Sequence, residues 1–194
     1  MPDEHLVYLR EGSFFAMLGH GPIGRGYSLI ASTAHVPSML DLDASSAEEL
    51  IVFTDRVRSL LRLHYGEAVI TEHGRVAPCV SEVTRRYEPH CLHAHRLVFP
   101  GQDQINLHVE LPEQEIRLFA SFGDARKEFR WPGQYLYAEG SDGACQLAVA
   151  PRRLPRRLFR TIMARRRGEP QLASWEKHPR LEEVEAARQE LVGA

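Results

Sequence analysis

Hydrophobic positions along the chain follow two periods, one of about two residues and one of about 3.6 residues. Apolar segments at residues 5–9 and 13–18, separated by a glycine turn, predict a β-hairpin. A glycine-rich loop at residues 19–26 leads into a third predicted strand at residues 27–32. Such a loop either brings backbone N–H groups to a phosphate or forms a plain surface turn, and the spacing alone does not decide between them.

The 3.6-residue period predicts one long amphipathic helix over residues 46–65. Its apolar positions recur at helical spacing and include Leu50, Phe53, Val57 and Leu61. Ser45 or Ser46, each followed three residues later by a glutamate, fits a capping box at the start of the helix. Gly66 is the expected end of the helix, because glycine tolerates the backbone conformation that closes one.

Two further strands are predicted in the first half of the chain, at residues 68–71 and 93–99. The polar segment between them, residues 75–89, contains two prolines and lacks periodicity, so it is expected to be a loop. A loop next to the histidine-bearing second strand is a natural place for substrate contacts. Residues 105–110 predict either a short strand or an irregular segment.

The C-terminal part has a different texture, with charged segments and fewer apolar runs. Residues 135–138 and 145–149 predict a hairpin around an Asp-Gly turn. An apolar stripe predicts a helix over residues 154–167, and residues 176–191 predict a short acidic helix.

These elements indicate an α+β fold with one sizeable hydrophobic core. We expect residues 1–111 to form the core unit and residues 112–194 to form a C-terminal elaboration, a hairpin and a helix packed on that unit.

Composition and charge narrow the class of protein. The chain has 194 residues and a net charge of -2, so no global field favours nucleic acid or a membrane. It contains no apolar stretch long enough to span a bilayer and no signal-peptide pattern, which predicts a cytoplasmic protein without a membrane partner. The three cysteines are expected to be reduced thiols. Eight arginines between Arg152 and Arg167 indicate a solvated helix face, with Arg157 or Arg160 as alternative phosphate ligands.

The most informative stretch contains three histidines and a cysteine within six residues, from His90 to His95. Because side chains alternate along a strand, one face of residues 93–99 carries His93, His95, Leu97 and Phe99, and the other carries Ala94, Arg96 and Val98. Two imidazoles on one face are about 7 Å apart along the strand. They form either a reactive pair or a structural one.

A zinc site is the metal-binding alternative for this stretch, with Cys79, His90, Cys91 and His93 as the ligands of suitable type. The ligand types suit zinc, but no Cys-x-x-Cys pair is present. We therefore predict no metal site and no required cofactor, and leave the participation of a divalent ion open.

The order of these motifs resembles that of the histidine triad (HIT) superfamily, in particular the larger HIT-like proteins with a C-terminal extension. His93-Ala94-His95 is preceded by Cys91 and followed by an apolar run and Pro100. The strand that leads to His35, the long helix and Glu72-His73-Gly74 precede it in the family's order. The resemblance covers about residues 6–100, and it extends more loosely into the C-terminal part.

The resemblance implies an antiparallel sheet with one long helix packed on it, and chemistry at phosphorus. His95 takes the position of the nucleophile that attacks the α-phosphorus of a nucleoside phosphate conjugate and forms a covalent nucleotidyl-histidine. His93 would orient it and His35 would support the same site. The implied contacts to phosphate and sugar come from Glu72, His73, Gly74 and Ser81, with Arg160 and Leu97 as further substrate-binding positions.

The physical chemistry of imidazole agrees with this assignment. An imidazole with a pKa near 6.5 is mostly neutral at pH 7, so a nucleophilic nitrogen is present without further activation. One ring nitrogen must keep its proton on a fixed acceptor so that the other faces the phosphorus.

Leu97 departs from the family pattern, which has a third histidine at this position that contacts the phosphate or the leaving group. Leucine offers no polar contact there, and Arg96 points to the other face.

From the resemblance, a nucleotide hydrolase or nucleotidyltransferase is the first hypothesis. The alternative is a non-hydrolytic nucleotide-binding protein or a repurposed enzyme of small-molecule metabolism on the same scaffold. A nucleotide or nucleotide conjugate is the expected ligand, nucleic acid is not expected, and the resemblance suggests a homodimer.

Overall fold

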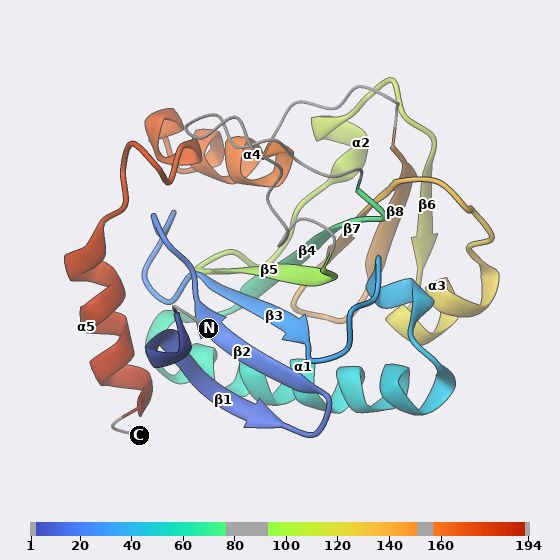
Figure 1. The fold of residues 1–194 in the computed structure, drawn as a ribbon. Helices are drawn as coiled ribbons and strands as arrows, with labels where there is room; N and C mark the ends of the chain where they lie inside the picture. Colours follow the sequence, from blue (N-terminus) through green and yellow to red (C-terminus); the bar gives the residue numbers. More distant parts are fainter. Residues whose placement is uncertain (1–2, 77–92, 151–156, 193–194) are drawn as a thin grey trace.

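Eight strands form one antiparallel sheet in the order β1-β2-β3-β5-β4-β7-β8-β6 (Figure 1). The computed structural model describes residues 3–76, 93–150 and 157–192. The strands are β1 (Val7–Glu11), β2 (Phe14–Leu18), β3 (Ser28–Ser32), β4 (Ala68–Gly74), β5 (His95–Pro100), β6 (Ile116–Phe119), β7 (Tyr135–Glu139) and β8 (Cys145–Val149). The α+β class expected from the sequence is thereby confirmed.

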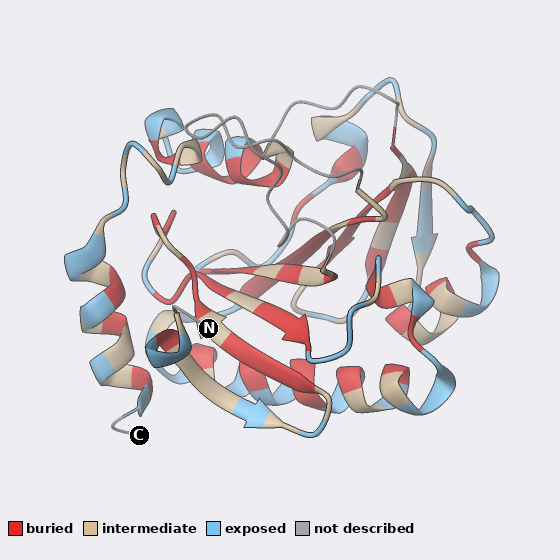
Figure 2. Ribbon diagram, in the orientation of Figure 1, coloured by how far each residue is buried: buried red, intermediate tan, exposed pale blue. Residues whose placement is uncertain are grey.

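Helices cover both faces of the sheet (Figure 1). The α-helices are α1 (Ala44–Tyr65), α2 (Leu107–Glu110), α3 (Phe122–Glu128), α4 (Leu158–Arg166) and α5 (Leu181–Val192). Short 3-10 helices are η1 (Glu4–Leu6), η2 (Met39–Asp41) and η4 (Pro170–Ala173). One core cluster joins α1, α3 and α5 to the first face, and a second joins α2, α4 and η4 to the opposite face. The buried positions of strands and helices accordingly meet at the sheet (Figure 2).

The long helix begins two residues earlier than expected. Asp43, rather than Ser45 or Ser46, caps it by accepting a hydrogen bond from the backbone N–H of Ser46 at 2.8 Å. Its predicted end at Gly66 is confirmed, with φ at 81°.

The other differences concern short elements. Residues 105–110 contain the single-turn helix α2, which Asn106 caps, instead of a strand. The charged segment after Pro112 contains β6 and α3, which its weak periodicity does not predict. The expected hairpin of β7 and β8 is confirmed.

The C-terminal part of the chain contributes directly to the sheet. β7 pairs with β4 from Ile70 opposite Glu139 to Gly74 opposite Tyr135. The strands of residues 1–111 and 112–194 are therefore hydrogen-bonded neighbours in one sheet, and β4 lies in its interior between β5 and β7.

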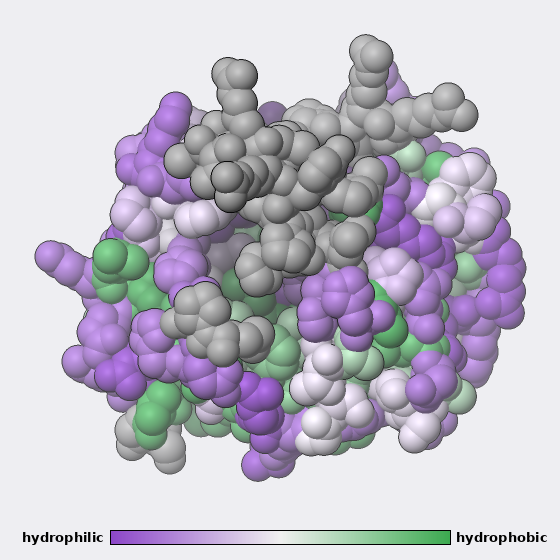
Figure 3. All heavy atoms as spheres, viewed as in Figure 1, coloured by the Kyte–Doolittle hydropathy of each residue, from purple (hydrophilic) through white to green (hydrophobic). Residues whose placement is uncertain are grey.

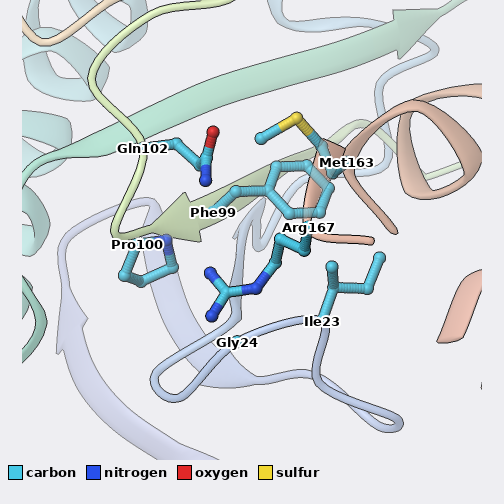
Figure 4. A pocket seen from close by; sticks show the side chains of 7 residues that line it. All are labelled: Ile23, Gly24, Phe99, Pro100, Gln102, Met163 and Arg167. Atoms are coloured by element: carbon cyan, nitrogen blue, oxygen red, sulfur yellow. The ribbon is translucent and has the colours of Figure 1, made fainter. Parts of the chain in front are cut away.

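The glycine-rich loop before β3 is packed against other parts of the chain. A Cβ at Gly21 would lie 2.6 Å from the Trp175 backbone, and one at Gly26 would lie 2.3 Å from the Tyr65 ring. Beside Gly24, a pocket of about 10 Å³ separates the loop from Phe99 and Arg167 (Figure 4). That volume holds about one water molecule, so the geometry favours the packed turn over a phosphate-binding loop.

The surface shown in Figure 3 mixes hydrophilic and hydrophobic residues among its described atoms. No helix within residues 3–76, 93–150 and 157–192 is long and apolar enough to cross a membrane.

A buried guanidinium connects the middle of the sheet to the helices on its first face. Arg96 is only 1% exposed and lies between the rings of Phe122 and Tyr137, with Cζ 4.2 and 4.8 Å from the ring centroids. Its nitrogens lie 3.8 Å from a Glu72 carboxylate oxygen and 3.7 Å from a Glu139 carboxylate oxygen. Strands β4, β5 and β7 and helix α3 all contribute to this cluster.

We expect Arg96→Met to lower the free energy of unfolding by about 3–5 kcal/mol, because it leaves the Glu72 carboxyl buried without its cation. Urea denaturation measures the loss. Arg117→Met is the matched control, since Arg117 forms an exposed pair with Glu115 and should change stability by no more than about 0.5 kcal/mol. Equal losses in the two variants would contradict the role of Arg96.

Candidate active site

The candidate site lies on the sheet face opposite α1, at the start of β5. Side-chain alternation along β5 directs His95 and Leu97 to this face, while the buried Arg96 points to the α1 side. In the observed register His95 pairs with Ala31 of β3, and Leu97 lies between Leu29 of β3 and Thr71 of β4. The prediction that Arg96 points to the face opposite His95 and Leu97 is thus confirmed.

A main-chain carbonyl fixes the His95 ring. His95 Nδ1 lies 3.0 Å from the carbonyl oxygen of His93 and donates its proton to it. The other nitrogen, Nε2, then keeps its lone pair. Burial lowers the pKa of His95 below 6.5, and the carbonyl opposes this shift only in part, so the ring is neutral at pH 7. A neutral, oriented imidazole is the form that a nucleophile or a general base requires.

His93 lies just before the strand, because β5 begins at His95 and not at residue 93 as predicted. Its Nε2 donates to the backbone carbonyl oxygen of Ser32 and lies 3.3 Å from the Ser32 hydroxyl oxygen. The ring of the exposed His35 stands next to it, with 5.2 Å between ring centroids. The structure therefore brings His35, His93 and His95 together, with the peptide oxygen of His93 as the direct link to His95.

His73 is the fourth histidine near this place. The register of β4 on β5, continued by two residues beyond Thr71, sets His73 beside His95. His73 Nε2 lies 3.2 Å from the side-chain oxygen of Gln134. Burial lowers the pKa of His73, the Gln134 contact opposes the shift, and a positive charge on His95 lowers the pKa further. Two neighbouring imidazoles thus favour the neutral form.

Glu72 and Gly74 are not brought to the histidines. Alternation along β4 turns the Glu72 side chain to the α1 face, where it accepts from Tyr135 Oη at 2.7 Å and from the Met39 backbone N–H at 2.8 Å. Burial raises the pKa of Glu72 despite the nearby Arg96. A Cβ at Gly74 would lie 2.1 Å from the Tyr135 ring, so this glycine permits close packing of β4 against that ring.

The two arginines considered for phosphate contacts are engaged elsewhere. Arg160 is buried and donates to the carbonyl oxygens of Gly21 and Leu172 at 2.6 and 2.9 Å, which ties α4 to the glycine-rich loop. Arg157 pairs with Glu176 at 2.8 Å. Neither guanidinium is directed at His95 in this arrangement.

Some predicted positions lie outside the described residues, namely Ser81 and the zinc candidates Cys79, His90 and Cys91. Within the described ranges, His, Cys, Asp and Glu side chains form no group of three or more that could hold a metal ion.

Leu97 occupies the position next to His95 on the same face. Its side chain is half-buried and packs against the second core cluster, which includes Phe99 and Leu136. Opposite it, the buried hydroxyl of Thr71 has no hydrogen-bond partner among the residues that the structure describes. This row of the site is thus apolar apart from one hydroxyl.

Two residues of the site are absent from the sequence interpretation. Ser32 holds His93 through its carbonyl and hydroxyl oxygens, and Gln134 contacts His73. Ser32 ends a predicted strand. A polar residue at the end of a strand next to the histidine-bearing strand is a sequence signal for such a contact to a histidine. Gln134 lies far along the chain, and only the pairing of β7 with β4 brings it near His73.

The lowered pKa values of His73 and His95 predict a specific pH dependence of stability. Below pH 6.5 the unfolded histidines take up protons that the folded ones resist, so the free energy of unfolding falls as the pH drops from 6.5 toward the folded pKa values. The loss is roughly 1.4 kcal/mol for each unit of pKa difference. Urea denaturation between pH 7 and pH 5 measures it. The double variant His73→Gln/His95→Gln should show a shallower slope, and an unchanged slope would refute the assignment.

Comparison of the sequence with known protein families found no family model that matches, and comparison with curated proteins found no match. The functional interpretation therefore depends on the residues of the chain itself.

Proposed function

We propose that the chain is a HIT-like enzyme that hydrolyses or transfers nucleotides, with His95 as the nucleophile. One observation supports this most directly: the Nδ1 proton of His95 is fixed on the His93 carbonyl while burial lowers the pKa of the ring. That combination leaves Nε2 as a neutral donor of an electron pair. The resemblance of the motif order to the HIT superfamily supplies the substrate class, a nucleoside phosphate conjugate.

In the first step, the Nε2 lone pair of His95 attacks the α-phosphorus. The N–P bond forms, the bond from phosphorus to the leaving group breaks, and the leaving group takes the electron pair of that bond. The proton that the leaving group needs comes from solvent or is already on the leaving group. The positive charge that develops on the imidazole is stabilised by the His93 carbonyl at Nδ1. His93 keeps that carbonyl in place because Ser32 holds its ring.

In the second step, water or another acceptor attacks the same phosphorus. The N–P bond breaks, the electron pair returns to Nε2, and the proton of the acceptor passes to a nearby base. Water as the acceptor releases a nucleoside monophosphate, and any other hydroxyl or phosphate yields a transferred nucleotide. His73, whose pKa burial also lowers, lies on the same face and is suited to accept that proton.

A second candidate function follows from Leu97. Its half-buried side chain packs into the apolar cluster and offers nothing to a leaving group. Leaving groups that need a proton from the enzyme would then react slowly. This favours either substrates whose leaving group departs without such a proton or nucleotide binding without turnover. In that case the histidines position the phosphate without forming a covalent bond.

Incubation with adenosine 5′-phosphoramidate should add one adenylyl group to the wild-type chain, detected by intact mass after acid-free quenching. His95→Asn should show no adduct, because its side chain has no nucleophilic nitrogen. His108→Asn is the matched control, since His108 is exposed on α2, and it should react like wild type. An adduct of equal yield on His95→Asn would exclude His95 as the nucleophile.

Leu97→His tests the departure from the family pattern. A histidine there would share the face of His95 and could donate a proton to the leaving group, so we expect turnover of the phosphoramidate to rise by about 10²-fold or more. Steady-state release of adenosine 5′-monophosphate measures it, and Leu97→Met is the size-matched control that should not accelerate the reaction. No change in Leu97→His would mean that this position does not limit the chemistry.

A further inference from the structure

A groove with three arginines and a tryptophan lies outside the histidine site. It is an open surface groove with a volume of about 360 Å³. It is built from η2, the turn after β4, the last turn of α3 and the segment that follows α3. Its lining consists of Leu40, Asp41, Arg75, Arg126, Phe129, Arg130, Trp131 and Pro132.

Trp131 forms a fixed aromatic platform in this groove. Its ring nitrogen donates to the Gln134 carbonyl oxygen at 3.0 Å, and its backbone carbonyl oxygen accepts from Arg75. The indole rests on Gly133, where an added Cβ would lie 2.8 Å from Trp131 Nε1. Even so, the residue is 40% exposed. A large aromatic ring that is held in place and still open to solvent is ready to stack with a planar ligand.

The charges that line the groove favour an anion. Arg75 and Asp41 neutralise each other through a close two-pronged pair. Arg126 donates to the Leu42 carbonyl oxygen and Arg130 to the Arg126 carbonyl oxygen, so both guanidinium groups keep their charge. Among the described residues neither forms an ion pair with a carboxylate. Two arginines beside an aromatic platform match the geometry of a phosphate attached to a ring system.

We propose that this groove is a second nucleotide-binding site, in which the base of a nucleoside monophosphate stacks on Trp131 and its phosphate binds Arg126 and Arg130. The site is separate from the histidine site and does not depend on covalent chemistry at His95. The two are nevertheless connected, because Gln134 accepts from Trp131 through its main chain and contacts His73 through its side chain. A ligand stacked on Trp131 would thus be linked to His73 through a single residue, Gln134.

A small ligand fits these observations better than a protein partner. A protein interface of standard size buries about 800 Å² on each side around an apolar centre. Here the groove is small, and its apolar residues Leu40, Phe129, Trp131 and Pro132 are interspersed with three arginines and one aspartate. Stacking of a base on an aromatic residue contributes about 1–3 kcal/mol and tolerates any base, so the structure assigns the class of ligand and not the base.

Tryptophan fluorescence can report on this groove alone. The chain has two tryptophans, and Trp175 stacks on His20 elsewhere, so Trp175→Phe leaves Trp131 as the only reporter. Titration of that protein with adenosine 5′-monophosphate should give saturable quenching. Adenosine and inorganic phosphate, each lacking one half of the ligand, should bind at least about tenfold more weakly.

Variants in the same Trp175→Phe background locate the phosphate contact. Arg130→Gln should weaken binding about tenfold, because a charged hydrogen bond to phosphate is lost. Arg117→Gln, at an exposed arginine outside the groove, is the matched control and should bind like its parent. Equal quenching in Arg130→Gln and its parent, or no saturation with millimolar nucleotide, would overturn the proposal.

Calorimetry separates this proposal from the enzymatic one. If both are right, wild type binds two nucleotides and Trp131→Ala binds one. If His95 forms no adduct and only the groove binds, wild type binds one nucleotide and Trp131→Ala binds none. If Trp131→Ala binds as many nucleotides as wild type with the same affinity, the groove is not a nucleotide site, whatever the result at His95.

Discussion

The arrangement of the whole site depends on the burial of one positive charge, that of Arg96. A guanidinium in the middle of a sheet is tolerated only where carboxylates and aromatic faces surround it, and here Glu72, Glu139, Phe122 and Tyr137 do so. Because neighbouring side chains of a strand point to opposite faces, this burial commits the adjacent residues of β5 to the other face. The charge cluster below the sheet and the imidazole above it are consequences of the same strand register.

The sequence predicts the regular parts of the fold because their side chains carry a clear period. The long helix α1 and the strands of both hairpins were expected close to their observed places. Short elements escape this reasoning. The four residues of α2 are too few to show a helical period, and its formation depends on the Asn106 cap. The edge strand β6 exposes the adjacent residues Arg117 and Leu118, so it lacks the alternation that would distinguish it from a loop.

The direction of a side chain could be predicted where it follows from strand alternation, and not where it depends on distant contacts. The position of His95 and Leu97 opposite Arg96 follows from alternation alone. His93 was expected in the same strand, but it precedes β5 and meets His95 through its main-chain oxygen. Glu72 was grouped with His73 because the two are adjacent in sequence, but adjacency in a strand means opposite faces. Arg160 looked like a phosphate ligand because of its charge. Its partners are instead the carbonyl oxygens of Gly21, 139 positions away, and of Leu172, 12 positions away, and no local pattern reveals them.

The pairing of β7 with β4 also has a consequence for the order of folding. The paired residues are more than sixty positions apart, so closing this contact costs more chain entropy than closing the β1–β2 or the β7–β8 hairpin. Until it closes, β4 is an edge strand, Gln134 is remote from His73, and Tyr135 is absent from Glu72. During synthesis His95 therefore emerges well before its surroundings exist, and the neutral, half-buried imidazole that the chemistry needs can form only once the C-terminal strands have joined the sheet.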